Sequence, residues 1–598
     1  MGKFNKKMNF IQMFFRKLIF LVLLLIFSRV NVIANGEALS PTILRRNIDR
    51  VASMDPIKAE SAGANRAVAL AYETLLEYDY LARPYKLKPY LLEAMPVLDA
   101  TGKIYRCKLR EDCFFGPSIL LGDGKNEQSR AVTAFDVVYS LKRLADAKLA
   151  SPGYWTIKGK ILGIDSFHQA SMDMSAPTDY DIEVAGLRVL DARTFEIELV
   201  EPSTEFLWIL AMPYTAVVPR EVAEKFGSAF GTIECGSGPY TLTSWKRNYS
   251  MIFTKRLNRS DARDAFQPIE NDNGQRSFDE IRFFVMDDAS TRWLSFLAEG
   301  LDINQEISRD NWDAVITSEG TLSEELKQQG IRLVSKDSMM VSYIAFNMDD
   351  AIVGENKLLR QAMTCAFDAE AWIRLNKGRV AFADGPVPPN VEARLEEPNS
   401  LNYNLAKARE LLAAAGYKDG IDPATGRPLK LTLDLGRTDQ ETRESAELIA
   451  SFMQKIGIEL ALQYNNWPLF LKKISRRESQ LFMVAWLADY PDALNFLQLF
   501  YSKNASPGPN RCNYSNRRYD ELYEAANIEQ NHDKRAEYIL EMQRIIREDA
   551  PWIFIHYGRD NVLLKPHLSN VVPHDFPYGL EKHWRTTPNP NSNDRSLH

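Results

Sequence analysis

The chain has 598 residues, of which 45% are hydrophobic and 25% are charged. This length exceeds what one hydrophobic core accommodates, so we expect two or three domains, and the ordinary hydrophobic content excludes a largely disordered chain. The 79 acidic and 73 basic side chains give a formal net charge of −6, which argues against nucleic acid as a partner. Residues 586–598, a tail rich in Pro, Asn and Ser, are predicted to be flexible.

Residues 1–34 have the parts of a secretory signal peptide. A positively charged stretch precedes residues 18–27, a run without a polar side chain, and Val32 and Ala34 occupy positions −3 and −1 of a cleavage site. The basic residues are Lys3, Lys6, Lys7, Arg16 and Lys17. Because a membrane-spanning helix needs about 20 apolar residues, we predict a cleaved signal peptide and a secreted protein. An N-terminal segment that is kept as an anchor is the alternative.

Helical and strand-like patterns then alternate along the chain, which is typical of an α/β fold. Residues 104–109 and 195–199 alternate in the manner of strands, and residues 133–147 between them are predicted to be a helix with Thr133 as its N-cap. Further predicted helices are 358–375, 404–415, 442–456, 520–526 and 534–548. Gly457 ends the helix 442–456, and the strand-like residues 458–463 follow directly.

Sequence motifs of common enzymes are missing from the chain. It has no GxxxxGK[ST] nucleotide loop, no GxSxG nucleophile elbow and no HExxH zinc motif. None of the seven histidines is paired at a spacing of three or four residues, as preformed metal sites often require. We therefore predict a protein that is not an enzyme, with no catalytic residue, no metal site and no cofactor.

The five cysteines are Cys107, Cys113, Cys235, Cys365 and Cys512, and none forms a CxxC pair. Cys107 and Cys113 lie close together around a predicted turn, so a disulfide between them is one possibility in an oxidising compartment. Buried free thiols are the alternative, and the odd count leaves at least one thiol free in either case.

A series of short motifs runs from about residue 44 to residue 583. Among the most characteristic are TAFDVVYSLKR at 133–143, GSGPY at 236–240 and WLADYPDALNF at 486–496. The other segments are 53–56, 71–75, 105–115, 300–302, 346–348, 359–362, 366–368, 385–389 and 403–416. In this order and spacing, the series resembles the peptide/nickel class of solute-binding proteins that serve ABC importers, known as extracellular family 5. The polar stretch 116–130 and residues 150–180 depart from the family pattern.

The resemblance implies a periplasmic binding protein-like α/β fold of type II, cluster C. Such a fold has two lobes joined by a hinge and an extra domain inserted in the first lobe. The expected segments are 40–85, 185–285 and 550–585 for lobe one, 86–184 for the extra domain and 286–549 for lobe two, with chain crossings near 285 and 549.

The resemblance also implies a function. A protein of this kind captures peptides between its lobes in the periplasm and delivers them to ABC permease subunits that work with cytoplasmic ATPases; we expect it to be a monomer. Within the family, the alternative solutes are a nickel chelate, haem, an oligosaccharide or a peptide-like antibiotic. A secreted hydrolase is the alternative from a different class.

Two residues of the segment 486–496 are the leading site candidates. By resemblance, Asp489 occupies the position of the aspartate that holds the peptide N-terminus, and Trp486 matches the tryptophan of the same motif. An ammonium in a closed cleft needs a carboxylate, because burying an unpaired charge is costly. The alternative is that Asp489 caps a turn and Trp486 packs in a core; Asp492 is a weaker candidate for the carboxylate.

Two further segments complete the predicted binding site. Glu60, Ser61 and Ala62 align with the lobe-one segment that runs beside the peptide backbone in oligopeptide-binding members. In the resemblance, Tyr343 and Asn347 lie in or beside a strand near the cleft, where the Asn347 amide would bond a ligand amide. Core packing is the alternative for Tyr343.

Overall fold

The computed structural model describes residues 41–121, 128–256, 275–305, 307–317, 320–576 and 579–587. The predicted signal peptide 1–34, part of the departing stretch 116–130 and most of the tail 586–598 lie outside these residues. Ile43–His598 form one compact unit, and the structure of its described residues follows. Among those residues, we find no helix with the length and apolar content to cross a membrane.

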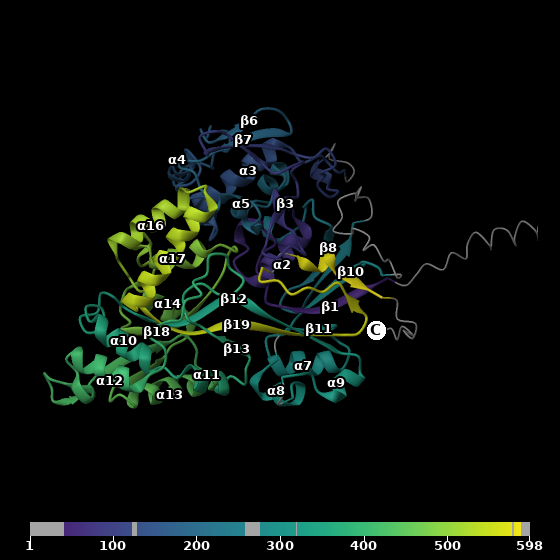
Figure 1. The fold of residues 1–598 in the computed structure, drawn as a ribbon. Coiled ribbons are helices and arrows are strands. Elements are labelled where there is room, and N and C mark those ends of the chain that lie inside the picture. Colours follow the sequence, from purple (N-terminus) through teal and green to yellow (C-terminus); the bar gives the residue numbers. More distant parts are fainter. Residues whose placement is uncertain are drawn as a thin grey trace, which may run out of the picture. The chain divides into compact units, whose positions relative to one another are not determined.

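The first sheet joins segments that lie far apart in the sequence (Figure 1). Its strand order is β1-β10-β9-β8, in which β1 (Ile43–Ile48) runs parallel to β10 (Glu280–Val285). The antiparallel neighbours are β9 (Ser250–Lys255) and β8 (Tyr240–Lys246). Helix α2 (Ala62–Ala71) contacts β8.

The second sheet has seven strands in the order β11-β19-β12-β18-β16-β17, with β13 paired to β19. Their bounds are β11 (Ile303–Asn304), β12 (Arg332–Phe346), β13 (Val380–Phe382), β16 (Lys430–Leu435), β17 (Glu459–Tyr464), β18 (Leu481–Leu487) and β19 (Trp552–Leu564). Strands β17 and β18 both run parallel to β16, so the carboxyl ends of these three strands share one edge. Strand β19 pairs in this sheet through β12. The assignment of residues 550–585 to lobe one stays a prediction.

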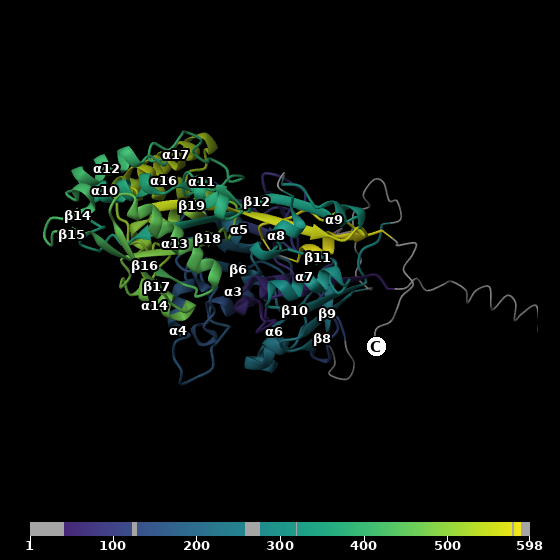
Figure 2. The same ribbon diagram turned by 90° about the horizontal axis from the view of Figure 1, so that it is seen from below.

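Two long strands connect the two sheets. The first half of β12 pairs with the end of β19, and the register shifts between Asp337 and Val341, where a bulge interrupts the ladder. Beyond the bulge, β12 pairs with β18 as well. At the other end of the ribbon, the Asp302 backbone N–H donates to the Arg45 carbonyl of β1 over 2.9 Å. The ribbon therefore crosses from one sheet to the other, as the β12 and β19 labels show from two sides (Figures 1 and 2).

A third sheet belongs to the region predicted to be the extra domain. Its order is β4-β5-β7-β6, with β4 (Val97–Leu98), β5 (Ile104–Lys108), β6 (Leu187–Val189) and β7 (Thr194–Glu198). The predicted strands 104–109 and 195–199 are thus confirmed, and β6 and β7 extend this sheet past residue 184. The predicted helix 133–147 is confirmed as α3 (Ala134–Ala145), where Thr133 and Asp136 form a capping box. Helix α4 (Ile164–Ala170) packs against α3.

The helices of the second half mostly follow the predictions. The observed helices are α12 (Leu405–Ala414), α13 (Gln440–Gln454), α16 (Arg517–Ile528) and α17 (His532–Asp549). The single helix predicted over 358–375 is wrong, because the chain forms α10 (Lys357–Ala366) and α11 (Ala369–Leu375). The Asp368 carboxylate accepts the Ala371 N–H over 2.9 Å and starts a new helix there.

The remaining elements are short. They are β2 (Leu76–Tyr78), β3 (Leu87–Pro89), α5 (Phe206–Ile209), α6 (Arg220–Phe226), α7 (Ala289–Leu297), α8 (Arg309–Val315), α9 (Glu324–Gln328), β14 (Ile421–Asp422), β15 (Arg427–Pro428), α14 (Trp467–Ser475), α15 (Ala493–Leu497), β20 (Leu568–Ser569) and β21 (Arg585–Thr586).

All five cysteines are buried free thiols, so the bridge considered between Cys107 and Cys113 is not formed. Burial raises the pKa of the Cys107 thiol to about 12, which keeps it protonated and unreactive at neutral pH.

Candidate functional site

The site candidates gather where the parallel strands of the second sheet end. Strands β16, β17 and β18 finish at Leu435, Tyr464 and Leu487, and α13, α14 and α15 begin shortly after them. In open α/β sheets, ligands bind beyond the carboxyl ends of the strands. Asp489 lies two residues past the end of β18, so the fold presents it at such an edge.

One buried amide holds the two leading candidates together. The Asn495 side chain, which is 0% exposed on α15, donates from Nδ2 to Asp489 Oδ2 over 3.3 Å. Its Oδ1 accepts from the Asp489 backbone N–H over 3.1 Å and from Trp486 Nε1 over 2.9 Å. Sequence reasoning missed Asn495, although it lies inside the same motif; a buried Asn six residues after an Asp has no signal of its own.

Burial sets the charge state of Asp489. Desolvation raises its pKa to about 6, the Asn495 hydrogen bond opposes this rise, and the charge of Glu205 adds to it. Tyr214, on the turn Pro213–Thr215, is also buried, and its pKa is raised above the ordinary value by burial and by the charges of Glu60 and Asp489. The charges of Glu60 and Asp489, from opposite parts of the chain, therefore act on the same tyrosine.

A contact between distant segments lies next to Asp489. The Tyr490 hydroxyl donates to the buried carboxylate of Glu205, just before α5, and Lys160 Nζ lies 2.7 Å from the same carboxylate. Asp492, the weaker candidate, N-caps α15 and accepts from Arg535 Nη2 over 2.9 Å. Asp492 therefore serves as a helix cap and as the partner of the part-buried Arg535.

The lobe-one candidates lie at the start of α2. Ser61 is its N-cap, with Oγ accepting the Ala64 N–H over 3.1 Å. Glu60 and Ala62 on either side are exposed. Of this segment, Glu60 is the residue that the electrostatics connect with the Asp489 cluster.

Tyr343 and Asn347, in β12 and directly after it, are both buried. Tyr343 is 2% exposed and stacks on Trp552 at an interplanar angle of 2°. Asn347 donates from Nδ2 to the Arg477 carbonyl over 3.0 Å and accepts from Asn513 Nδ2 over 3.2 Å. The structure gives both residues packing roles and does not join them to the Asp489 cluster through the interactions described here. A ligand role for either stays a prediction.

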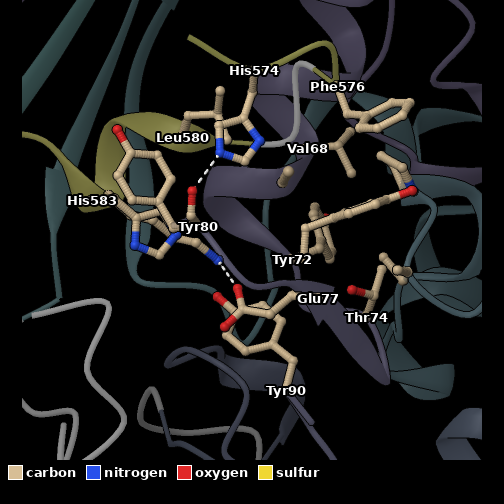
Figure 3. Close-up of a pocket in the computed structure, with 16 residues that line it drawn as sticks. Val68, Tyr72, Thr74, Glu77, Tyr80, Tyr90, His574, Phe576, Leu580 and His583 are labelled. Carbon is tan, nitrogen blue, oxygen red and sulfur yellow. Dashed lines mark hydrogen bonds and ion pairs between the residues drawn. The ribbon is translucent and has the colours of Figure 1, made fainter. Parts of the chain in front are cut away.

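An enclosed cavity of about 40 Å³ lies elsewhere, between α2 and the C-terminal segment (Figure 3). Tyr80 stacks between His574 and His583, at ring distances of 5.1 and 4.5 Å. Glu77 and Lys582 form an ion pair at the cavity wall. Because a water molecule needs roughly 10–15 Å³, this space suits a few waters and is too small for a peptide. Within the described residues, no group of three or more His, Cys, Asp or Glu side chains could hold a metal ion.

Comparison with known families decides the identity. The family described as "Bacterial extracellular solute-binding proteins, family 5 Middle" matches residues 86–508. The chain belongs to this family. Solute binding rather than catalysis is the role of family 5 proteins, which agrees with the prediction made from the motifs.

Curated family 5 relatives match most of the chain. The periplasmic oligopeptide-binding protein OppA of Salmonella typhimurium is 23% identical over 89% of this chain and 90% of that protein. Di/tripeptide-binding protein 1 of Pseudomonas aeruginosa is 24% identical over 84% of this chain and 86% of its own length. Heme-binding protein A of Haemophilus influenzae is 24% identical over 65% of this chain and 67% of its length.

Solved structures share the fold. The periplasmic binding protein DppA of Helicobacter pylori, in complex with peptide STSA, has a TM-score of 0.69 at 20% identity, covering 91% of this chain and 98% of its own. The Escherichia coli murein tripeptide binding protein MppA has a TM-score of 0.69 at 22% identity, covering 92% and 99%. At these identities the likeness shows the fold alone: the two-lobe type II architecture is confirmed.

Proposed function

We propose that this family 5 protein binds peptides with a free α-ammonium group and that Asp489 is the partner of that ammonium. The observation that carries the proposal is the Asp489 carboxyl, desolvated at the strand ends, with its pKa raised to about 6. Ionising a carboxyl in such surroundings costs free energy, and an ammonium ligand offsets that cost. Relatives named for oligopeptide and di/tripeptide binding support a peptide as the ligand.

The neighbouring candidates make the other contacts with the peptide. Trp486, fixed by its bond to Asn495, supplies an aromatic wall beside the ammonium. The segment Glu60, Ser61 and Ala62 faces the peptide backbone from lobe one, and Glu60 adds negative charge near Tyr214. The Tyr490–Glu205 contact then joins the lobes next to the bound ammonium.

The proposal extends to the transport cycle. After cleavage of residues 1–34, the protein acts in the periplasm as a monomer and delivers its peptide to ABC permease subunits driven by cytoplasmic ATPases. The lobe limits stay as expected from the sequence, with the addition that β19 pairs with the second sheet. The chain crossings near residues 285 and 549 stay the expected hinge, and the register shift between Asp337 and Val341 gives the β12–β19 ribbon a place to bend with it.

A titration tests the ammonium site. The chain from residue 35 is unfolded, freed of carried ligand and refolded, and peptides of two to five residues are titrated into it by calorimetry. Each peptide is used with a free and an acetylated N-terminus. We expect acetylation, and separately Asp489→Asn, to weaken peptide binding by at least about 30-fold. Each change removes one charge of a desolvated pair and leaves the other charge without its partner.

Asp533→Asn is the matched control, since its side chain is 99% exposed on α17. It should bind as the wild type does. Equal affinity for free and acetylated peptides would remove the ammonium role from Asp489, while the family assignment would stand.

Haem is the second candidate ligand, because one relative of similar score is named for heme binding. The same refolded protein is titrated with haem, and its absorption spectrum is recorded. Binding of haem that free peptides do not displace, together with no response to any peptide, would favour haem over peptide.

A further inference from the structure

A second, larger hollow lies away from the Asp489 cluster, across the long strands of the hinge. Its volume is about 1060 Å³, and its floor includes Ser335 and Asp337 of β12 and Arg559 and Asn561 of β19. Residues 335 and 337 are two positions apart and so lie on the same face of β12, and residues 559 and 561 share one face of β19 in the same way. We call this hollow the hinge groove; none of the residues assigned to the peptide site lines it.

The walls of the hinge groove come from two helices. Trp312 and Asp313 of α8 form one wall, and Ile373 and Arg374 of α11 form the other. In Figure 1, α8 and α11 lie on the opposite side of the β12–β19 ribbon from α2 and α5. The two helices that line the groove therefore lie across the ribbon from the helices that follow Glu60 and Glu205.

The chemistry of the lining is cationic and partly apolar. The charged side chains are Lys336, Arg374, Lys377, Arg559, Asp313 and Asp337, so cations outnumber carboxylates in a chain whose net charge is −6. Trp312 and Ile373 add apolar surface, and Ser335 and Asn561 add hydrogen-bonding groups. Pockets for small organic ligands combine these features: apolar walls with a few placed polar groups.

The cations differ in how firmly they are held. Arg559 lies 2.9 Å from Asp337 and Lys336 lies 2.6 Å from the buried carboxylate of Asp575. Arg374 approaches Glu370 only at 3.6 Å, with side-chain exposures of 68% and 89%. Such an exposed pair contributes little free energy, so the Arg374 guanidinium is available to an incoming anion.

We propose that the hinge groove binds a small organic anion with an apolar body, and that Arg374 is its main charge partner. The apolar body lies against Trp312 and Ile373 and the anionic group meets the guanidinium. The proposal does not rest on a peptide as the ligand of the other site.

Binding there should depend on the separation of the two walls. The α8 wall follows β11, whose neighbour Asp302 bonds to β1 of the first sheet, while the α11 wall packs through Trp372 in a hydrophobic core with strands of the second sheet. The two walls are bridged by Lys377 Nζ and Asp313, 2.5 Å apart. Where a ligand of the other site changes this separation, each of the two ligands changes the affinity for the other by the same factor.

The test uses the refolded full-length mature chain and 8-anilinonaphthalene-1-sulfonate, an aromatic anion whose fluorescence reports binding. We expect Arg374→Glu to weaken binding of this probe by at least about fivefold, because charge reversal replaces an attraction with a repulsion. Arg517→Glu on α16 is the matched control, since Arg517 is 94% exposed and lies outside the groove lining. It should leave the affinity unchanged.

A second readout places the probe. The protein is labelled with 5-fluorotryptophan, and the ¹⁹F resonance of Trp312 is identified by its loss in Trp312→Phe. We expect the probe to shift this resonance in the wild type and not in Arg374→Glu. The proposal is overturned if Arg374→Glu binds the probe as the wild type does, if Arg517→Glu loses as much affinity, or if Asp489→Asn abolishes the signal and Trp312 does not respond.

Discussion

Two partly buried carboxyl groups of this protein have opposite electrostatics. Glu77 lies in the first lobe, and although burial opposes ionisation, Lys582 and Lys88 lower its pKa below the usual value. For Asp489, burial dominates and raises the pKa to about 6. The first carboxyl is stabilised by cations of its own chain, which makes it part of the fold. Burial makes the second carboxyl costly to ionise, and a ligand ammonium would offset that cost, as is typical of a residue in a binding site.

The largest effect should come from breaking the structural pair. Lys582→Met leaves Glu77 with the more exposed Lys88 alone, at 3.3 Å. We expect a loss of about 3 kcal/mol in the free energy of unfolding, because removing one partner of a buried pair leaves a desolvated charge. Urea denaturation measures it. Lys503→Met, at a side chain 71% exposed, is the control and should leave the free energy of unfolding almost unchanged. Equal losses would contradict the comparison.

The next effect concerns acid stability in the same region. Burial lowers the pKa of His574 in the folded protein to about 4, whereas its pKa in the unfolded chain is about 6.5. The neutral ring therefore stabilises the folded state above about pH 6.5, and this stabilisation is lost as the pH falls toward about 4. When the pH is lowered from 7 to 5, the free energy of unfolding of His574→Phe should fall by about 2 kcal/mol less than that of the wild type. The reason is that Phe keeps the stack on Tyr80 and takes up no proton. Urea titrations at both pH values measure the difference. An unchanged pH dependence would show that His574 titrates normally.

Asp489 should behave in the opposite way to a structural carboxyl. Its folded pKa is raised, so the protonated form favours folding at low pH and that contribution is lost as the pH rises from about 4 to about 6. Asp489→Asn should therefore stabilise the ligand-free protein by about 1.5 kcal/mol at pH 7, after allowance for solvent screening, and by much less at pH 4. Denaturation at the two pH values measures this. A destabilised variant at pH 7 would assign Asp489 to the fold.

The smallest effect sharpens the role of Asn495. Asn495→Leu removes the bonds that orient Asp489 and Trp486, so peptide affinity should fall about tenfold. The variant Asn495→Asp distinguishes a role in positioning Asp489 from a role in packing. It keeps the side-chain volume but places a second carboxyl beside Asp489. In this variant, the pH at which peptide binding is half lost should move upward. An unmoved pH profile would leave Asn495 with a packing role only.

Local signals predicted much of this fold. Thr133 caps a helix as expected, and Gly457 ends one, because capping chemistry acts over a few residues. The break at Asp368 was missed, since the apolar pattern continues across it and only the carboxylate cap interrupts the helix. The place of β19 could not be predicted, because pairing with β12 depends on segments far apart in the chain.

In the candidate site, too, local motifs could be predicted and contacts between distant segments could not. Asp489 and Trp486 followed from a motif that resembles the family, whereas Asn495 and Tyr214 emerged from three-dimensional contacts. The stacking of Tyr343 on Trp552, which lies on another strand, could not be read from the sequence, and a ligand role for Tyr343 stays a prediction. Residue spacing predicts the chemistry of single elements, and it does not predict which elements meet.

The most direct test of the account is the titration of the Asp489 carboxyl itself. Aspartate labelled with ¹³C at the side-chain carboxyl is incorporated, and the Asp489 resonance is identified by its loss in Asp489→Asn. In the ligand-free protein we expect a pKa of about 6, and with a saturating peptide that has a free N-terminus we expect it to fall below about 4. A pKa that is unchanged by the peptide would contradict Asp489 as the ammonium partner.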